Sequence, residues 1–272
     1  MEKELELEAL SKSIRFAENL LINLGAKEDL NLEQKIILSI YRKLIEHADG
    51  NFILTDHMLA GPARIVARTS FENLLALKYI LLEEEHIKNR AFCYYIGYIK
   101  SIQRKFENSS RETIPNHYRN AILPATSKIL NDSLLNEILI EWKHTKGKSN
   151  YDPYWYSLFE GPKNIYRLVT KINDPKFYKY YSLLSEETHA TQALNGLDDF
   201  DLINGNFSLL PIRSAHNIGF HERTVRAFCT SAIHEIIKYM SPDLNDDFIN
   251  FMDEIGVIEK NRTDLIAKIQ FK

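Results

Sequence analysis

The sequence predicts an all-α protein, folded as a single-domain bundle of about eight or nine helices. Three observations favour this class. Apolar residues recur at alternating spacings of three and four, which is the period of an amphipathic helix. Gly and Pro, the residues that interrupt helices, number only 10 and 8 among 272 residues. Strand-like alternation of apolar and polar residues is hard to find anywhere along the chain.

The first two helices have recognisable ends. An apolar stripe over residues 7–24 stops at Gly25, which predicts the end of the first helix. Asn31 and Gln34 have the spacing of a capping box, in which each side chain bonds the other residue's backbone N–H. They predict the start of a second helix, which we expect to end at Gly50.

The middle of the chain carries the longest helical pattern. Residues 63–106 are periodic throughout, with a break between two helices expected near Glu85. Asp132 or its neighbour Asn131 is a suitable cap for a helix over 133–146. The aromatic, turn-rich stretch that follows, 147–162, predicts an ordered loop. The remaining predicted helices cover 165–173, 177–194, 219–240, 246–255 and 262–269.

We expect one domain over residues 1–272, with a C-terminal helical segment, 219–270, packed on the rest. The composition is 44% hydrophobic and 26% charged, with a formal net charge of −3, as in an ordinary globular protein. This balance gives no general attraction to nucleic acid or to an anionic membrane, so such binding would need a local basic patch.

Two features predict a cytoplasmic location. Cys93 and Cys229 lie in helical patterns, and two cysteines are too few for a disulfide framework, so we expect reduced, buried thiols. The N-terminus, MEKELELEAL, lacks the basic-then-apolar order of a signal peptide. Every apolar run falls short of the ~20 residues that span a bilayer, so no membrane segment is expected.

The segment KYYSLLSEETHATQALNG supplies the first candidate site. Ser185 and His189 are four residues apart and share one helix face, which Tyr181 also joins. Imidazole exchanges protons near neutral pH, so His189 is the candidate acid–base. The alternative is a core histidine whose hydrogen bonds are satisfied by Ser185 or by a backbone carbonyl.

Arg68 and Glu72 form a second candidate pair at the i, i+4 spacing. On a solvated face such a pair would contribute little to stability. Because Phe71, Leu74 and their neighbours are strongly apolar, the pair could instead face inward and form part of a site.

Two further motifs compete with this interpretation. Glu-x-x-His, the helix motif of ferritin-like di-metal proteins, occurs at Glu83–His86 and at Glu186–His189. Glu72 or Glu46 could supply a further ligand. Arg42 and His47 have the Arg-x4-His spacing of a family of helical, metal-independent ribonucleases. This spacing occurs easily by chance, and Lys43 stands where that family favours a small polar residue, so the motif carries little weight.

Two more regions are candidate contact surfaces. Arg213 begins a stretch rich in Arg and His that could bind a phosphate or a carboxylate, although solvated charges before a helix are the simpler explanation. Trp155 lies in the aromatic loop Tyr151–Phe159, which is a candidate contact with substrate or with a protein partner.

Three blocks of the sequence, taken in order, carry a resemblance to a known family. They are RTSFENLLALKYIL, WYSLFEGPKNIYRLVTKI and YKYYSLLSEETHA. Together they resemble a widespread microbial family known only as a domain of unknown function, family 5677, over roughly Leu30 to Arg226. The resemblance implies an all-helical fold. It also supports a single site made of Arg68, Glu72, Ser185 and His189.

These observations favour an enzyme that acts on RNA or a nucleotide, as a metal-independent ribonuclease or a nucleotide hydrolase. Its role would be that of a toxin-like or phage-defence effector. His189 would be the acid–base, Arg68 would stabilise negative charge, and Tyr181, Arg213 and Trp155 would bind substrate. We expect no cofactor and a homo-oligomer. The alternatives are a non-catalytic binding or assembly module with a buried Arg–Glu–Ser–His network, and a di-metal carboxylate protein.

Overall fold

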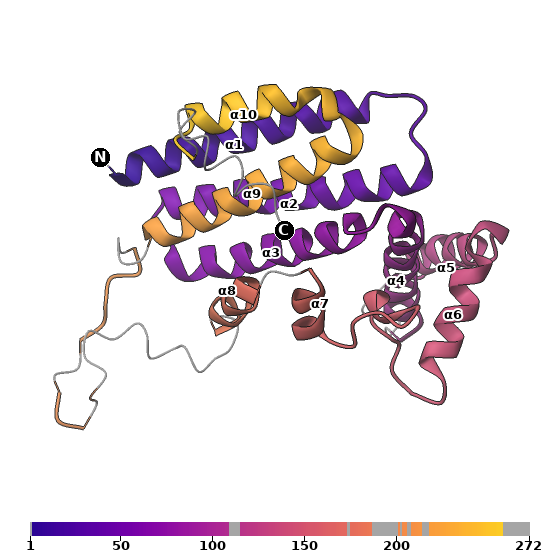
Figure 1. The fold of residues 1–272 in the computed structure, drawn as a ribbon. Helices are drawn as coiled ribbons and strands as arrows, with labels where there is room; N and C mark the ends of the chain where they lie inside the picture. Colours follow the sequence, from indigo (N-terminus) through magenta and orange to yellow (C-terminus); the bar gives the residue numbers. More distant parts are fainter. Residues whose placement is uncertain are drawn as a thin grey trace. The chain divides into compact units, whose positions relative to one another are not determined.

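The computed structural model describes residues 2–108, 115–172, 175–186, 201, 203–205, 208–213 and 218–257. These residues contain ten α-helices, some of them joined by short 3₁₀ turns, and no sheet, which confirms the predicted all-α class (Figure 1). The chain divides into two compact units. The first unit comprises Met1–Leu30, Leu38–Lys78 and Lys176–Lys272, and the second comprises Asn31–Ile37 and Tyr79–Pro175.

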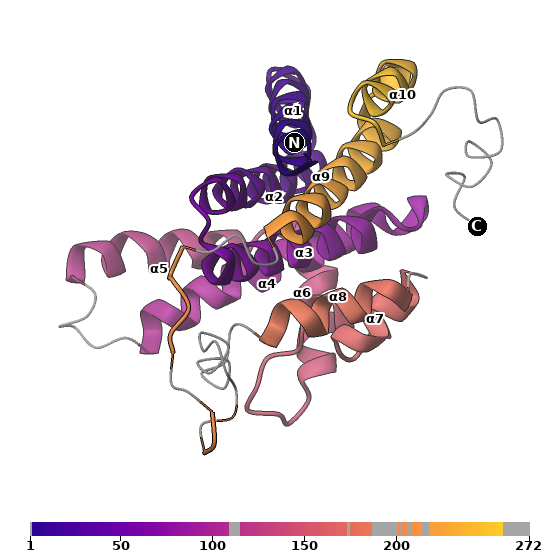
Figure 2. The same ribbon diagram turned by 90° about the vertical axis from the view of Figure 1, so that its left-hand side faces the viewer.

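Four long helices form the centre of the first unit: α1 (Glu2–Gly25), α2 (Leu32–Asp56), α3 (Ala60–Leu81) and α9 (Ile218–Met240). Helix α1 packs along α9 (Figure 2). The hydroxyl of Tyr41 on α2 donates to the carbonyl of Ala17 on α1 at 3.3 Å. Phe71 on α3 packs on Phe228 of α9 with ring centroids 5.0 Å apart. The apolar stripes of these helices therefore meet in one buried core.

Two shorter helices complete the described part of the first unit. Helix α10 (Asn245–Glu254) follows the 3₁₀ turn Pro242–Leu244, and its Phe251 stacks on Phe16 of α1 with centroids 4.5 Å apart. Helix α8 (Pro175–Glu186) carries Tyr180, which meets the ring of Phe228 edge-on at 6.3 Å. This contact holds α8 beside α9, next to the middle of α3.

The second unit is organised around α4 (Ile87–Asn108), which packs against α5 (Asn116–Leu130) and α6 (Asn136–Lys146). The aromatic loop predicted from the sequence contains the 3₁₀ turn Trp155–Ser157, which also packs on α4. The short helix α7 (Ile165–Lys171) follows this loop.

Several helix ends lie where the sequence predicts them. The backbone N–H of Asn31 donates to Oε1 of Gln34 at 3.0 Å, and the N–H of Gln34 donates to Oδ1 of Asn31 at 2.9 Å, which is the expected capping box. The predicted break near Glu85 is the 3₁₀ turn Glu84–His86 between α3 and α4. Asp132 caps the 3₁₀ turn Ser133–Leu135 that leads into α6, since its side chain accepts from the N–H of Leu134.

The predicted end of the second helix at Gly50 is wrong, because α2 continues to Asp56. Gly50 lies beside α3, where a Cβ in its place would contact Cγ1 of Val66 at 3.7 Å. Asn51 and Thr55 in the next turn are buried, and the side chain of Asn51 donates to the carbonyl of Ala63 at 2.7 Å. Packing against α3 therefore stabilises the helix beyond the glycine, and tertiary contact overrides local propensity.

The predicted helix over 177–194 is described only as far as Glu186, and the one over 262–269 lies outside the described residues. Among the described residues, no helix is long and apolar enough to cross a membrane.

Candidate functional site

Arg68 and Glu72 lie one turn apart on α3 and form an ion pair, with Nε of Arg68 3.1 Å from Oε1 of Glu72. The two ends of the pair differ in exposure. The Arg68 side chain is 22% exposed, whereas that of Glu72 is 45% exposed. The pair therefore lies at the edge of the first unit, with the guanidinium on the inner side. This position is intermediate between the two alternatives left open by the sequence, a solvated surface pair and an inward-facing pair.

Tyr181 of α8 is the second partner of Arg68. Nη2 of Arg68 donates to the Tyr181 hydroxyl at 3.2 Å, and the guanidinium carbon lies 5.2 Å from the centre of the Tyr181 ring. Hydrogen bonding and cation–π attraction act together on one group. Three contacts, to the carboxylate, the hydroxyl and the ring, thus hold the planar guanidinium in one orientation at the α3–α8 contact.

Ser185 lies one turn after Tyr181 on α8 and is partly buried. Its hydroxyl donates to the backbone carbonyl of Tyr181, within its own helix. This is the local bonding pattern that Ser adopts in helix interiors. Ser185 therefore shares the helix face predicted for it, and its O–H proton is directed along α8.

His189, the predicted acid–base, lies outside the described residues, as does the segment around it. Glu186 is the last residue of α8. The proposed metal set of Glu72, Glu186 and His189 therefore remains a prediction. Within the described ranges, no group of three His, Cys, Asp or Glu side chains is placed to hold a metal ion.

The remaining predicted binding residues lie elsewhere. Arg213 is exposed, in an irregular segment that the structure describes over 208–213. Trp155 belongs to the second unit, where it packs on Tyr79 and Tyr94 with ring centroids 5.7 and 5.2 Å away. Trp155 also lines a pocket of that unit.

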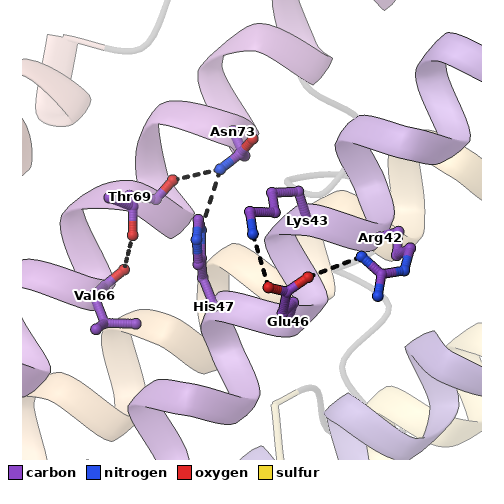
Figure 3. Close-up of polar contacts among 7 residues, drawn as sticks. All are labelled: Arg42, Lys43, Glu46, His47, Val66, Thr69 and Asn73. Carbon is purple, nitrogen blue, oxygen red and sulfur yellow. Dashed lines mark hydrogen bonds and ion pairs between the residues drawn. The ribbon is translucent and has the colours of Figure 1, made fainter. Parts of the chain in front are cut away.

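A polar cluster of His47 on α2 with Thr69 and Asn73 on α3 joins the two helices. Thr69 and Asn73 form a row of side chains along α3, next to the row that contains Arg68 and Glu72. The side-chain nitrogen of Asn73 donates to the Thr69 carbonyl at 2.7 Å and lies 3.3 Å from Nδ1 of His47 (Figure 3). The Thr69 hydroxyl in turn donates to the carbonyl of Val66 at 2.7 Å. Thr69 and Asn73 follow Arg68 and Glu72 directly in sequence, so the two rows leave the helix about 100° apart.

The environment of His47 favours its neutral form. Burial, and secondarily the charge of Lys43, lowers the pKa of the imidazole below its ordinary value of 6.5, although Glu46 and the Thr69 carbonyl oppose this shift. When Asn73 donates to Nδ1, the proton of the neutral ring is on Nε2. A half-buried, neutral imidazole is a group that can accept a proton.

Arg42 and Lys43 lie on the solvent side of this cluster. Arg42 pairs with Glu46 at 2.8 Å, and Lys43 pairs with the other carboxylate oxygen at 2.7 Å (Figure 3). The hydrogen bond from Lys43, and then the one from Arg42, lowers the pKa of Glu46 despite its partial desolvation. The Arg42 side chain is 66% exposed, so the Arg-x4-His motif has one exposed end and one half-buried end.

Sequence reasoning gave little weight to His47 and identified neither Asn73 nor Thr69 as its partners. The available signal was the i, i+4 spacing of Thr69 and Asn73 on the helix that carries Arg68. Taken together, the described residues place a fixed guanidinium, a tyrosine hydroxyl and a neutral imidazole around α3. Such groups can stabilise negative charge and transfer a proton.

Comparison with known proteins supports the predicted relationship. A model of a family of unknown function, DUF5677, matches residues 34–204, which contain α3, the aromatic loop and α8. No curated protein and no solved structure matches the chain. Because the match extends over more than half of the sequence, the chain belongs to the DUF5677 family.

Proposed function

We propose that the chain is an enzyme that acts on a phosphate-containing substrate, RNA or a nucleotide, at the polar face of α3. The observation that carries this proposal is the state of Arg68. Its guanidinium is held by Glu72 and Tyr181, and yet its side chain retains 22% exposure. A planar, pre-oriented guanidinium matches the geometry of phosphate oxygens.

Each polar group has a role in this proposal. Arg68 stabilises the negative charge that develops on the transferred phosphate, while Glu72 and Tyr181 keep the guanidinium oriented. His189 is the predicted acid–base, with His47 a second candidate because its pKa is lowered and its ring is neutral near pH 7. Ser185 and Tyr181 contribute to the substrate-binding face.

The chemistry on RNA needs only these groups. The imidazole removes the proton from a 2′-hydroxyl, the 2′ oxygen attacks the adjacent phosphorus, and the 5′ oxygen leaves with a proton returned by the imidazolium. The products are a 2′,3′-cyclic phosphate and a free 5′-hydroxyl. Identification of these ends would separate this reaction from hydrolysis by an activated water, which leaves a linear phosphate.

The test measures cleavage of a labelled single-stranded RNA and hydrolysis of nucleoside triphosphates, with and without EDTA. We expect Arg68→Gln to lower the rate about a hundredfold or more, as removal of an oxyanion-stabilising donor does. His189→Ala should lower it by about 10²–10⁴-fold. The matched control is Arg223→Gln, because Arg223 lies on α9 and pairs with Glu6, away from the α3 face. Absence of turnover in the wild type, or equal rates in Arg68→Gln and wild type, would overturn the proposal.

As a biological role we propose a cytoplasmic effector that damages RNA or nucleotides, such as a toxin or a phage-defence protein. Expression of the wild type should slow bacterial growth, and expression of the Arg68→Gln variant at the same level should not. Equal growth in both cultures would exclude this biological role and would leave the enzymatic proposal unaffected.

A non-catalytic binding or assembly module is the second candidate, favoured by the exposure of the aromatic loop. Tyr151 and Tyr154 are 82% and 61% exposed, and Phe159 is 42% exposed. Exposed aromatic side chains are typical of protein contact surfaces. For this function, neither the wild type nor Arg68→Gln would turn over RNA or nucleotides, and Arg68→Gln would only lower thermal stability. Tyr151→Ser would weaken binding of a protein partner or assembly of a homo-oligomer.

A di-metal protein, the third alternative, has a direct test. It predicts stoichiometric iron, manganese or zinc in the purified protein, measured by elemental analysis. A metal content near zero would eliminate it.

A further inference from the structure

A pocket in the second unit has features of a ligand site that is separate from the proposed function. It has a volume of about 180 Å³, and its lining includes the aromatic side chains of Tyr79 and Trp155. His86, Asn89, Arg90 and Lys171 contribute nitrogen-bearing side chains to the same lining. The pocket thus combines aromatic surface with a concentration of hydrogen-bond donors, the composition by which small-molecule sites are recognised.

Arg90 is the fixed cation of this pocket. Its side chain is only 10% exposed, and Nη1 donates to the carbonyl of Tyr79 at 3.0 Å. The guanidinium lies 4.5 Å from the centre of the Tyr79 ring, and Nη2 pairs with Glu83. A buried guanidinium held on three sides keeps its planar fork in one orientation, and a guanidinium has five N–H donors in total.

The pocket carries more positive than negative charge among its described residues. The hydrogen bond from Arg90 is the main cause of the lowered pKa of Glu83, and the charges of Lys171 and His86 act in the same direction. Among the residues that line the pocket, Arg90 and Lys171 are cationic and none is Asp or Glu. Two carboxylates lie nearby and are already engaged, Glu83 by Arg90 and Glu141 by the Thr145 hydroxyl and a backbone N–H. An anion would find complementary charge here.

The aromatic wall is held rigidly in place. A Cβ added to Gly97 of α4 would lie 3.0 Å from Cβ of Trp155, so the base of the Trp155 side chain lies directly against the helix. Phe159, at the far end of the loop, has a left-handed φ of 52°, and its N–H donates to Oε1 of Glu141 at 3.0 Å. Glu160 follows with a φ of 57°. Left-handed conformations at two successive non-glycine residues are strained, and such strain persists where surrounding contacts fix a site.

The volume restricts the size of the ligand. About 180 Å³ is below the ~300–1,000 Å³ of pockets for drug-sized compounds. We propose that this pocket binds a small planar aromatic anion, a single ring bearing one phosphate or carboxylate. The ring packs against Trp155, and the anionic group is held by Arg90, with Lys171, His86 and the Asn89 amide completing its contacts.

The test uses fluorescence of Trp155 in the full chain. The variant Trp142→Phe removes the other tryptophan, and phenyl phosphate and benzoate are the probes. We expect saturable quenching by at least one of them, and the tighter binder identifies the anionic group. Inorganic phosphate and phenol, which each lack one half of the recognised chemistry, should bind at least tenfold more weakly. The wild-type chain should show a rise in melting temperature with the same probe.

Charge variants decide whether the binding is specific to the pocket. Lys171→Gln should weaken binding of the better probe about tenfold, because Lys171 is exposed at the rim and its loss leaves the fold intact. Lys143→Gln, on the exposed face of α6 outside the pocket lining, is the matched control and should leave the affinity unchanged. The proposal is overturned by non-saturable quenching, by equal binding of phenol or phosphate, or by equal effects of the two lysine variants.

Discussion

The guanidinium of Arg68 on α3 donates a 3.2 Å hydrogen bond to the hydroxyl of Tyr181 on α8, 113 positions further along the chain. This contact joins two of the sequence blocks that carry the family resemblance. Phe in place of Tyr181 removes only the hydroxyl and keeps the ring that lies beside the guanidinium.

Tyr181→Phe should lower the free energy of unfolding by about 1 kcal/mol, since hydrogen bonds to charged groups are worth ~1.5–3 kcal/mol and this one is partly exposed. In a chain that already carries Arg68→Gln, the same substitution should cost much less. Urea denaturation of the four proteins in a double-mutant cycle measures the coupling. Strictly additive costs would show that the hydrogen bond contributes nothing.

Gly161→Ala should destabilise the second unit by about 1–3 kcal/mol, the range of an overpacked core. A Cβ at this position would lie 2.9 Å from both the carbonyl of Leu158 and the hydroxyl of Tyr79, and closer still to the carbonyl of Tyr156. Backbone oxygens cannot move aside as a flexible side chain can. The measurement is the urea midpoint of the variant against wild type.

Gly25→Ala is the control for that substitution. Gly25 ends α1, and a Cβ added there meets nothing within 4 Å. Replacement should be neutral or stabilise by about 0.5 kcal/mol, because it reduces the freedom of the unfolded chain. If the two alanine variants unfold at the same urea concentration, the crowding at Gly161 is not a constraint in solution.

His47 should make stability depend on pH. Burial is the main cause of its lowered pKa in the folded state, so the unfolded chain binds more protons once the pH falls below about 6.5. This contribution to stability is therefore present above that value and is lost as the pH decreases. Urea denaturation at about pH 7.5 and about pH 5.5, on either side of the ordinary value, should show a smaller difference for His47→Gln than for wild type.

His234 on α9 gives an independent second contribution, because burial lowers its pKa as well. His47→Gln combined with His234→Gln should therefore reduce the pH dependence further than either change alone. An unaltered difference between the two pH values in the double variant would contradict both assignments.

The thiols should be unreactive while the protein is folded. Burial raises the pKa of Cys93 and of Cys229 to about 12 in each case, so the reactive thiolate is scarce at neutral pH. A thiol reagent such as Ellman's reagent should modify them slowly in buffer and rapidly in concentrated urea. Rapid reaction of either cysteine in the native protein would mean that its surroundings open to solvent.

The sequence predicted the fold class well because helix signals are local. The capping box of Asn31 and Gln34 and the break before Ile87 depend on residues within one turn of each other. The error at Gly50 has the opposite origin. Whether α2 ends at Gly50 depends on contacts with Val66 and Ala63 of α3. These contacts cannot be inferred from the spacing of residues along α2.

For the candidate site, too, contacts within one helix could be predicted from the sequence, and contacts between helices could not. The i, i+4 pair of Arg68 and Glu72 follows from helix periodicity, whereas the bond to Tyr181 depends on how α8 packs. The pocket of the second unit was missed because Arg90 and Lys171 lie on different helices, far apart in the chain. Charges that meet only after folding leave no motif in a single sequence.

The positions of Trp142 and Trp155 give the protein an internal reporter. The chain has two tryptophans, and both lie in the second unit. Emission excited at wavelengths that only indole absorbs therefore follows the unfolding of that unit, while far-ultraviolet circular dichroism follows helices of both. Coincident transitions would mean that the two units melt as one cooperative body, and a lag between the signals would show in which order they open.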